Sequence, residues 1–327
     1  MPESLGLAAG AVYIITLLLM MPMIVKGADF VKLGEFTATL LSVCSMVLVG
    51  FVDDVIDLKW RYKILLPAIA ATPLLILYRM TGGNTHVLLP PSYLLELGPL
   101  YYAYMLMFVT FCTHSINILA GVNGVEVGQT MVIACFALLH NLICIFQGYK
   151  THEHYHSLLC LAPFIAVCGA LLKQNWFPAQ VFVGDTFCYF GGMTLAVAGI
   201  LGHYSKTMMI LFIPQVFNFI ISLPQLFRLV HCPRHRLPRI GEDGRLHPSV
   251  TIIDKESIIV KLFLRVGLSQ RRGEKEITNF TLLNVLLLVL GPLREDHLAM
   301  AFLGLQTASC SVALFIRHYF PHLLFSK

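Results

Sequence analysis

The sequence contains little charge. Asp, Glu, Lys and Arg make up 13% of its 327 residues, whereas 57% of the residues are hydrophobic. In soluble domains about a quarter of the residues are charged. This composition excludes an ordinary water-soluble domain and predicts a polytopic membrane protein.

Paired cysteines are also absent. The nine cysteines are scattered and none forms a C-x-x-C pair, so neither a disulfide framework nor a zinc site is indicated. A signal peptide is not indicated either, because the first apolar run has no Lys or Arg before it and is too long for the apolar part of such a peptide. The C-terminal string HLLFSK carries no retrieval or lipidation motif.

Long apolar runs, by contrast, recur along the chain. Nine are long enough to cross a membrane: residues 5–25, 36–52, 64–80, 100–120, 127–147, 157–173, 186–203, 206–229 and 297–317. A shorter run, residues 279–291, predicts a re-entrant or interfacial helix. Pro214 and Pro224 predict a kink in the eighth span. The sequence therefore predicts an all-α polytopic membrane protein with about nine transmembrane helices in a single domain over residues 1–327.

Positive charge divides unequally between the loops of the two sides. The loops after the second, fourth, sixth and eighth spans lie on one side, which holds 16 of the 23 Lys and Arg residues, while the other side holds 7. By the positive-inside rule the richer side is cytosolic. It includes a long polar loop, residues 230–278, which we expect to form a cytosolic insertion with a hairpin turn at 241–244 and a surface helix at 257–268.

A cluster of charges follows the second span. The stretch FVDDVIDLKWRYK, residues 51–63, contains three acids and then three bases, namely Asp53, Asp54, Asp57, Lys59, Arg61 and Lys63. On a helix, Asp53 and Asp57 share a face, where like charges repel one another. A divalent cation is the usual way to hold such a group ionised. The alternative is a solvated helix end with ordinary loop charges.

Further polar groups border other spans on the same side. Asn117 closes the fourth span, and Gly121 and Asn123 follow it. A glycine there either lets backbone amides approach a phosphate or a base, or simply caps a loop. Asp185 opens the seventh span, where an acid is costly unless it is paired, bound to metal or used as a helix N-cap. Phe182 beside it suits an interface anchor or a stacking surface for a base.

The long loop carries a basic triplet. Arg234, His235 and Arg236 place three donors of the phosphate-binding type in a row, although a patch that touches anionic lipid has the same composition. Acids for a metal and cations for phosphates thus gather on one membrane face. This is the inventory of a magnesium-dependent phosphoryl-transfer site, and the membrane setting indicates a lipid substrate.

A second group of polar side chains lies on the opposite face. The string THEHYH contains His152, His154 and His156 around Glu153. Histidines at such a spacing can bind metal. Because they lie across the membrane from the acids, they cannot join the same site.

Five strings lie along the chain in this order: PESLG at 2–6, GFVDDVIDLKWRYK at 50–63, FCTHSINILAGVNGVEVGQ at 111–129, NWFPAQVFVGDTFCYF at 175–190 and PRHRLPR at 233–239. They resemble the polyprenyl-phosphate N-acetylhexosamine-1-phosphate transferase family, and in particular its members that use dolichyl phosphate. Those relatives carry a span and a cytosolic loop before the first string, so we expect this chain to have one span fewer.

The resemblance implies a reaction, a cofactor and a place. N-acetylglucosamine 1-phosphate passes from UDP-N-acetylglucosamine to dolichyl phosphate, with Mg²⁺ as cofactor, in the endoplasmic reticulum membrane with the active site facing the cytosol. The implied roles are the reacting centre for Asp53 and Asp54, metal binding for Asn117 and Asp185, lipid-phosphate binding for Lys63, Thr113, Ser115 and Asn117, and nucleotide-sugar binding for Glu3, Gly121, Asn123, Phe182, Arg234, His235 and Arg236.

The residues alone leave two other functions open. An intramembrane prenyltransferase also binds Mg²⁺-diphosphate through D-D-x-x-D acids, but it needs a second acid-rich motif, and here Asp185 stands alone. A nucleotide-sugar transporter would show repeat symmetry and polar groups at the middle of the membrane. The resemblance is compatible with a homodimer, and no nucleic-acid partner is indicated.

Overall fold

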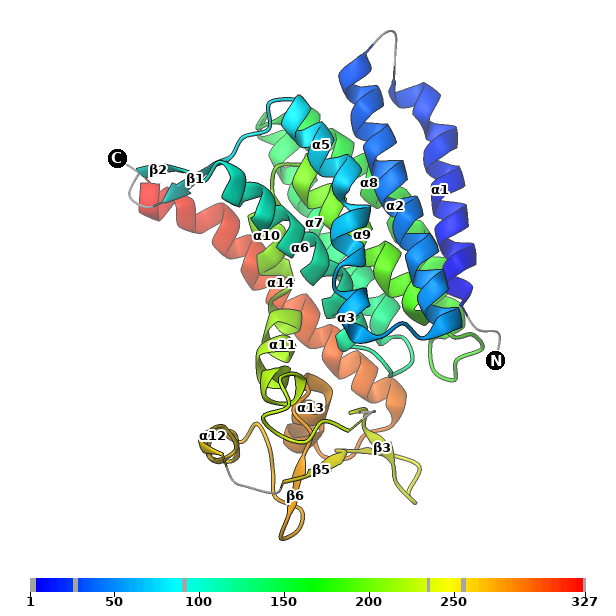
Figure 1. Ribbon diagram of the computed structural model, residues 1–327, viewed down its shortest axis with the longest axis vertical. Coiled ribbons are helices and arrows are strands. Elements are labelled where there is room, and N and C mark those ends of the chain that lie inside the picture. The colour runs from blue at the N-terminus through cyan, green and yellow to red at the C-terminus, as the bar shows by residue number, and fades with distance from the viewer. Residues whose placement is uncertain (1–3, 26–28, 90–92, 234–235, 254–256, 326–327) are drawn as a thin grey trace.

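The protein is mainly helical in a computed structural model that describes residues 4–25, 29–89, 93–233, 236–253 and 257–325 (Figure 1). Backbone groups inside lipid must be paired within their own segment, so long apolar runs fold as helices. The predicted spans are occupied by α1 Leu5–Ile24, α2 Phe30–Ile56, α3 Trp60–Lys63, α4 Leu66–Ala70, α5 Thr72–Met80, α6 Pro99–Ile118, α7 Val125–Phe146, α8 Thr151–Asn175, α9 Gly184–Leu201, α10 Ser205–Leu211, α11 Ile213–Leu226 and α14 Glu295–Phe325.

The described helices include seven segments that are long and apolar enough to cross a membrane, with α3 to α5 taken as one segment. The bent pair α10–α11 raises this number to eight. The remaining predicted span, the fourth, corresponds to α6. This helix has 20 residues but is not among the candidate spans, and the polar string THSIN lies in its last turns. The prediction of an all-α polytopic membrane protein is therefore confirmed.

Prolines shape two of the spans. Between α10 and α11 the chain turns by 69°, just before Pro214, as its ring and missing N–H group dictate. Pro224 lies in the last turn of α11 instead, close to the point where that helix ends. Pro67 and Pro73 stand near the beginnings of α4 and α5, so the third span consists of three short helices. The predicted kink is confirmed at Pro214.

Helix α9 is the centre of the bundle. Within its span 94% of the residues are buried, compared with 22–44% in the other candidate spans. It contacts α1, α2, α6, α7, α8 and α10. Glycines permit the closest of these contacts: a Cβ on Gly50 of α2 would lie 2.5 Å from Thr186 Cα, and one on Gly192 would lie 2.4 Å from Thr113 Cα. Small residues let membrane helices approach in this way.

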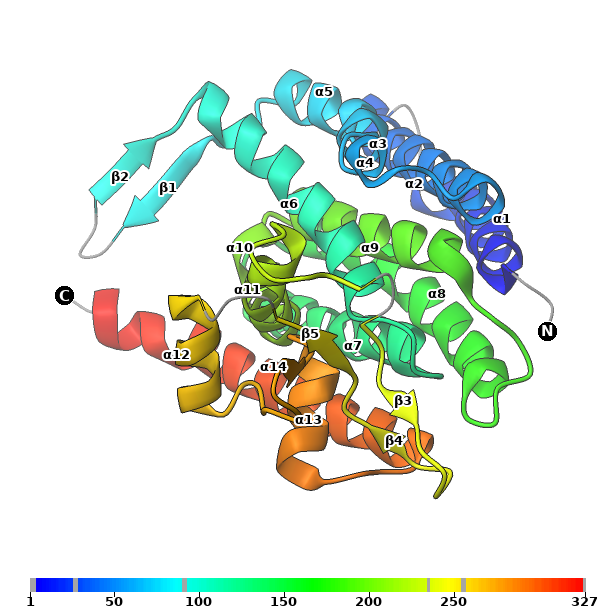
Figure 2. The same ribbon diagram turned by 60° about the horizontal axis from the view of Figure 1, so that its bottom comes forward.

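A small lobe covers one end of the helices (Figures 1 and 2). Its strands pair antiparallel, β3 Arg239–Ile240 with β4 Leu246–His247 and β5 Val250–Ile252 with β6 Glu276–Thr278. The predicted turn is confirmed, since the Gly244 N–H donates to the Gly241 carbonyl at 3.0 Å and Gly244 has a φ of 69°. The other two predicted elements are α12 Ile258–Val266 and α13 Leu282–Leu290.

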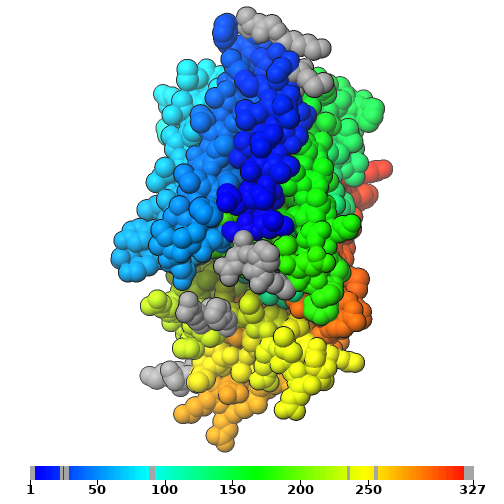
Figure 3. Space-filling model, turned by 90° about the vertical axis from the view of Figure 1, so that its right-hand side faces the viewer, coloured from blue at the N-terminus to red at the C-terminus, as the bar shows by residue number. Residues whose placement is uncertain are grey.

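The surface at that end is formed by the yellow and orange residues of the lobe, below α1 in the space-filling view (Figure 3). Buried Leu282, Leu283 and Leu287 of α13 pack in one apolar cluster with Leu298 and Phe302 of α14, which fixes the lobe to the longest helix. A second hairpin, β1 His86–Leu89 with β2 Tyr93–Glu96, projects between α5 and α6 and was not predicted from the Gly- and Pro-rich segment 81–99.

We predict that Gly192→Ala destabilises the protein by about 1–3 kcal/mol, the usual cost of overpacking a core. The added Cβ would meet Thr113 Cα at 2.4 Å and Cys112 O at 2.6 Å, and neither backbone atom can turn away. Gly304→Ala on α14 is the control, because nothing lies within 4 Å of its Cβ position. Thermal unfolding of the two variants in one detergent measures the difference, and equal midpoints would refute the tight contact of α6 with α9.

Candidate active site

The carboxylate of Asp54, near the end of α2, caps the N-terminus of α9. Its Oδ1 accepts the N–H of Asp185 at 2.6 Å, and its Oδ2 accepts the N–H of Thr186 at 3.1 Å and the Thr186 hydroxyl at 2.5 Å. The hydroxyl of Ser4, just before α1, also donates to Oδ2. A carboxylate is favourable there because the first N–H groups of a helix lack partners and its dipole is positive.

The backbone around this cap leaves no room for larger residues. Gly184 has a φ of 73°, and a Cβ on it would lie 2.4 Å from Asp54 Oδ2. The N–H groups of Leu5 and Gly6 donate to the carbonyls of Phe182 and Val183 at 3.1 Å each. The beginning of α1, the end of α2 and the beginning of α9 are thus joined at one point.

Asp53 points elsewhere and pairs with Lys63. Its side chain is buried, accepts the Tyr189 hydroxyl at 2.8 Å and lies 2.8 Å from Lys63 Nζ. The same ammonium lies 3.5 Å from Asp185 Oδ2 and 3.8 Å from Asp57 Oδ1. Lys63 is therefore surrounded by three carboxylates that come from two different parts of the chain.

The expectation that the acids after the second span share one helix face is wrong. Helix α2 ends at Ile56, and Asp57 follows it in a left-handed conformation with a φ of 52°. Asp53 and Asp54 are successive residues of a helix and diverge by about 100°. The Lys63 ammonium lies between Asp53 and Asp57, and the described residues contain no group of three carboxylates that could share one metal ion.

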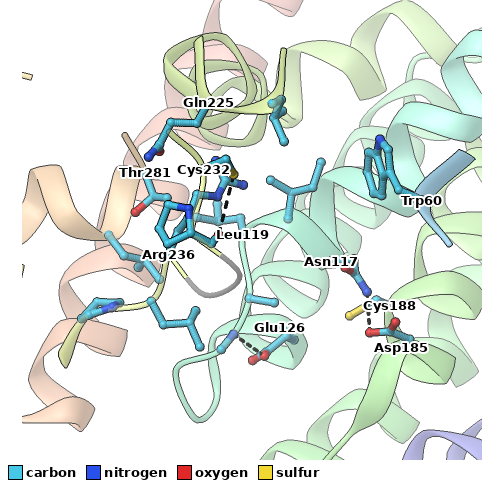
Figure 4. A pocket seen from close by; sticks show the side chains of 18 of the residues that line it. Trp60, Asn117, Leu119, Glu126, Asp185, Cys188, Gln225, Cys232, Arg236 and Thr281 are labelled. Atoms are coloured by element: carbon cyan, nitrogen blue, oxygen red, sulfur yellow. Dashed lines mark hydrogen bonds between the residues drawn. The ribbon is translucent and has the colours of Figure 1, made fainter. Parts of the chain in front are cut away.

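Asn117 and Asp185 meet at the edge of a cavity of about 950 Å³ (Figure 4). Asn117 lies in the last turn of α6, and its Nδ2 donates to Asp185 Oδ1 at 2.6 Å. Both residues line the cavity. Carboxylate and amide oxygens are ligands of the hard type, and Mg²⁺ takes only one or two from a protein when substrate phosphates supply others. This pair therefore fits a magnesium ion.

The opposite wall of the cavity comes from α11 and the lobe. Figure 4 shows Arg236, Gln225 and Thr281 across from Asn117 and Asp185. Arg236 Nη1 is buried and, within the described residues, has no hydrogen-bond partner. Burial lowers the pKa of this guanidinium, since the charged form loses hydration. A phosphate would supply the missing acceptor.

The loop between α6 and α7 forms a third wall. Gly121 has a φ of 94°, and a Cβ on it would lie 2.2 Å from Leu237 Cδ2, so this position requires glycine. Its N–H donates to Glu126 Oε1 at 2.7 Å. Asn123 lies outside the cavity lining, and its N–H donates to Glu295 Oε1 at 2.8 Å. Phe182, half exposed, lines the cavity beside Asp185.

Two residues expected near the lipid phosphate are turned into the bundle. The Thr113 hydroxyl is buried and donates to the carbonyls of Val109 and Thr110. The buried Ser115 hydroxyl donates to the carbonyl of Cys112 at 3.4 Å. Lys63 and Asn117 of the same expected group both approach Asp185. Three other candidates, Glu3, Arg234 and His235, lie outside the described residues.

The three histidines of THEHYH do not form one site. They lie in the first turns of α8, where residues two apart point in nearly opposite directions. His152 is exposed, while His156 is buried with its Nδ1 3.8 Å from Glu35 Oε2. His154 is buried against α7, where its Nδ1 lies 2.8 Å from Asn141 Oδ1. Three histidines at this spacing could bind one metal ion in an extended chain, but the helix turns their side chains in different directions.

The sequence did not identify several residues that build the cavity. Gln225 donates to Asn279 Oδ1 at 2.7 Å and accepts the Phe280 N–H at 3.0 Å, which joins α11 to the segment before α13. Glu126, buried beside Gly121, and Thr281 also line the cavity. Gln225, a single amide near the end of an apolar span, could have indicated such a contact from the sequence, because a buried amide requires a hydrogen-bond partner.

Comparison with known proteins places the chain among transferases, by a family match and by similarity to curated relatives. Residues 36–203, more than half of the chain, match the family described as glycosyl transferase family 4. Three curated relatives are each named UDP-N-acetylglucosamine–dolichyl-phosphate N-acetylglucosaminephosphotransferase. The chain is 40% identical to the one from Schizosaccharomyces pombe, over 100% of this chain and 84% of that protein. It is 46% identical to the one from Saccharomyces cerevisiae, over 90% of this chain and 70% of that protein. It is 38% identical to the one from Dictyostelium discoideum, over 98% of this chain and 78% of that protein.

We predict that Asp54→Ala lowers the free energy of unfolding by about 0.5–2 kcal/mol, the usual range for a lost helix N-cap. The substitution leaves the N–H groups of Asp185 and Thr186 without their acceptor. Asp243→Ala is the control, since that exposed carboxylate holds only the hairpin turn through Arg245 and His247. Thermal unfolding in detergent compares them, and a loss no greater than the control's would contradict the capping role.

Proposed function

The chain belongs to glycosyl transferase family 4, and we propose that it transfers N-acetylglucosamine 1-phosphate from UDP-N-acetylglucosamine to dolichyl phosphate. An oxygen of the lipid phosphate attacks the phosphorus that carries the sugar. The bond from this phosphorus to the oxygen that bridges it to the uridine phosphate breaks, and UMP leaves with that bonding pair. The product is dolichyl-diphospho-N-acetylglucosamine.

The observation that carries the proposal is that Lys63 contacts Asp185, which lines a polar cavity, and stands two residues before Leu65, which lines an apolar groove. On one side lies the cavity with Asn117, Asp185 and Arg236. On the other, a groove of about 510 Å³ begins at Leu65 and runs between α4, α5 and α6. Its lining is Leu65, Ala68, Ile69, Thr72, Leu75, Ile76, Arg79, Tyr102 and Leu106. A water-soluble donor and a membrane-borne acceptor can therefore meet at one ammonium group.

Lys63 would orient the acceptor phosphate. Asp53, which accepts a hydrogen bond from the Tyr189 hydroxyl, holds the ammonium in place, so a charge-assisted hydrogen bond from the ammonium to a phosphate would have a defined direction. Asp53 itself is 2% exposed and engaged with both groups. A carboxylate so enclosed is a poor nucleophile, which favours direct attack by the lipid phosphate over a covalent intermediate on Asp53.

The donor would occupy the cavity. Arg236 would bind the diphosphate through the buried nitrogen that lacks a partner, and the close-packed Gly121 and half-exposed Phe182 would hold the uridine. Asn117 and Asp185 would bind Mg²⁺, which when bound neutralises the charge that develops on the diphosphate. Asp54 would contribute indirectly, because its carboxylate holds the backbone of Asp185 at the beginning of α9.

We further propose that this end of the protein faces the cytosol and that the membrane is that of the endoplasmic reticulum. The side that carries the lobe and the cavity has 16 of the 23 Lys and Arg residues. A cytosolic cavity would also receive a nucleotide sugar directly from solution. Labelling of single cysteines at positions 54 and 185 in sealed microsomes tests the orientation, and labelling from opposite sides would exclude the site.

In the assay that tests the function, purified protein is incubated with UDP-N-acetylglucosamine, dolichyl phosphate and Mg²⁺, and UMP and the lipid diphosphate are measured. We expect both products, and we expect Asp185→Ala to abolish them across a Mg²⁺ titration. Asp29→Ala is the control, since this residue caps α2 through the Lys32 N–H at 3.1 Å at the other end of the bundle. This variant should lose only a helix cap and keep activity. Unchanged turnover in Asp185→Ala would remove this residue from the metal site.

A second experiment separates the two substrates. Arg236→Ala should weaken the apparent affinity for UDP-N-acetylglucosamine, and Lys63→Ala mainly that for dolichyl phosphate. Each loss should be about ten- to a hundredfold, because a charge-assisted hydrogen bond to phosphate contributes roughly 1.5–3 kcal/mol. Exposed Arg239 and Lys59 provide matched alanine controls outside the cavity lining. If Arg236→Ala weakened only the lipid's affinity, the basic segment would be a lipid contact instead.

A further inference from the structure

A second cluster of ligating side chains lies at the other end of the bundle. His140 and Cys144 are one turn apart on α7, and His154 is in the first turn of α8. One ligand atom from each lies within 4.8 Å of the other two. All three are buried, with exposed fractions of 0%, 3% and 2%. None of the residues proposed for the transferase reaction belongs to this group.

A fourth side chain, from α14, lies next to His140 but outside the group whose ligand atoms are within 4.8 Å of one another. His318 Nε2 lies 3.1 Å from His140 Nδ1, and the two rings have centroids 5.1 Å apart. Cys144 Sγ lies 3.9 Å from the same His140 nitrogen. A tetrahedral zinc ion, with bonds of about 2.0–2.3 Å, holds neighbouring ligand atoms about 3.3–3.6 Å apart. Some of the present separations are larger than this, so the side chains would have to move together by about an ångström or more when the metal binds, His318 most of all.

The surroundings of the cluster match a supported metal site. His154 Nδ1 lies 2.8 Å from Asn141 Oδ1, which leaves Nε2 as the nitrogen for a metal. The Asn141 amide in turn donates to Ser157 Oγ at 2.9 Å, and Ser157 lies 2.6 Å from the Tyr204 hydroxyl. Metal-bound histidines in proteins typically donate their second nitrogen to an oxygen in just this manner, which fixes the tautomer and the orientation of the ring.

We propose that His140, Cys144, His154 and His318 bind a zinc ion that links α7, α8 and α14. Three imidazoles and one thiolate are a borderline-soft set, which suits Zn²⁺ and does not suit Mg²⁺. The site is structural, because four protein ligands leave no open position for a substrate. It is chemically unlike the oxygen-lined site at the opposite end and independent of the transferase reaction.

The alternative is a hydrogen-bonded histidine pair without metal. His140 and His318 can satisfy each other as neutral donor and acceptor, and Arg317, which donates to Thr207 Oγ1 at 3.1 Å, adds positive charge next to the pair. In the zinc site, the Cys144 thiolate would offset one of the two positive charges of Zn²⁺, which lessens the repulsion from Arg317. The two arrangements differ in a measurable way, since only one of them retains metal and requires the Cys144 thiolate.

The test is the metal content of the full chain, purified in detergent through a tag without histidines and measured by mass spectrometry. We expect about one zinc ion per chain from one set of four ligands. Cys144→Ser and His154→Ala should lose it. The controls are Cys135→Ser, on α7 outside the cluster, and His152→Ala, exposed in the first turn of α8, and both should retain it. Wild-type protein without zinc, or equal zinc in all variants, would overturn the proposal.

A second measurement needs no variant. After chelator treatment, the wild-type protein is titrated with Co²⁺, which reports tetrahedral coordination by intense visible bands and a bound thiolate by a charge-transfer band in the near ultraviolet. We expect both bands, and a higher thermal midpoint when Zn²⁺ is restored, because the metal would bind only the folded arrangement of the three helices. Weak octahedral bands without the charge-transfer band would exclude the site even if the variants fail to fold.

Discussion

The structure of the candidate active site depends on one carboxylate at a helix N-terminus. Asp54 accepts two backbone N–H groups of α9 and two hydroxyls, one of them from the segment before α1. The unpaired N–H groups of a helix terminus attract an anion strongly, and here the anion belongs to a neighbouring helix. Because Asp185 supplies one of those N–H groups, the direction of its side chain toward Asn117 and Lys63 follows from this contact.

The distribution of charge explains how a membrane protein keeps so many ionised groups together. Asp53, Asp57 and Asp185 share one ammonium, so the fully buried carboxylate, that of Asp53, has a partner of opposite sign, as burial requires, while the Asp57 side chain is largely exposed to solvent. Arg236 lies across the cavity without such a partner among the described residues. The cavity is thus matched to an anionic ligand whose phosphates would complete the hydrogen bonds of the arginine and share the lysine.

The two ends of the bundle offer different coordination chemistry. The end under the lobe presents oxygen ligands, in Asn117 and Asp185, beside cations. The other end presents imidazole nitrogens and a thiol, from His140, Cys144 and their neighbours. Hard oxygen ligands suit Mg²⁺ and phosphate chemistry, whereas nitrogen and sulfur suit zinc. The absence of a C-x-x-C pair did not exclude such a site, because its proposed ligands come from two consecutive helices, α7 and α8, and from the distant α14.

The sequence by itself determined the elements whose causes are local. Apolar runs became helices, Pro214 introduced the bend, and Gly241 to Gly244 formed the turn, because each outcome depends on residues a few positions apart. It also placed Lys63, Asn117 and Asp185 on one side of the membrane. Only the tertiary structure decided that Asp53 pairs with Lys63 while Asp54 caps α9, that Gln225 and Thr281 complete the cavity, and that His154 joins His140 rather than His152. These contacts join residues of different helices or loops, and the cap of α9 forms where α2 approaches α9 most closely, at Gly50, a distance that no local pattern specifies.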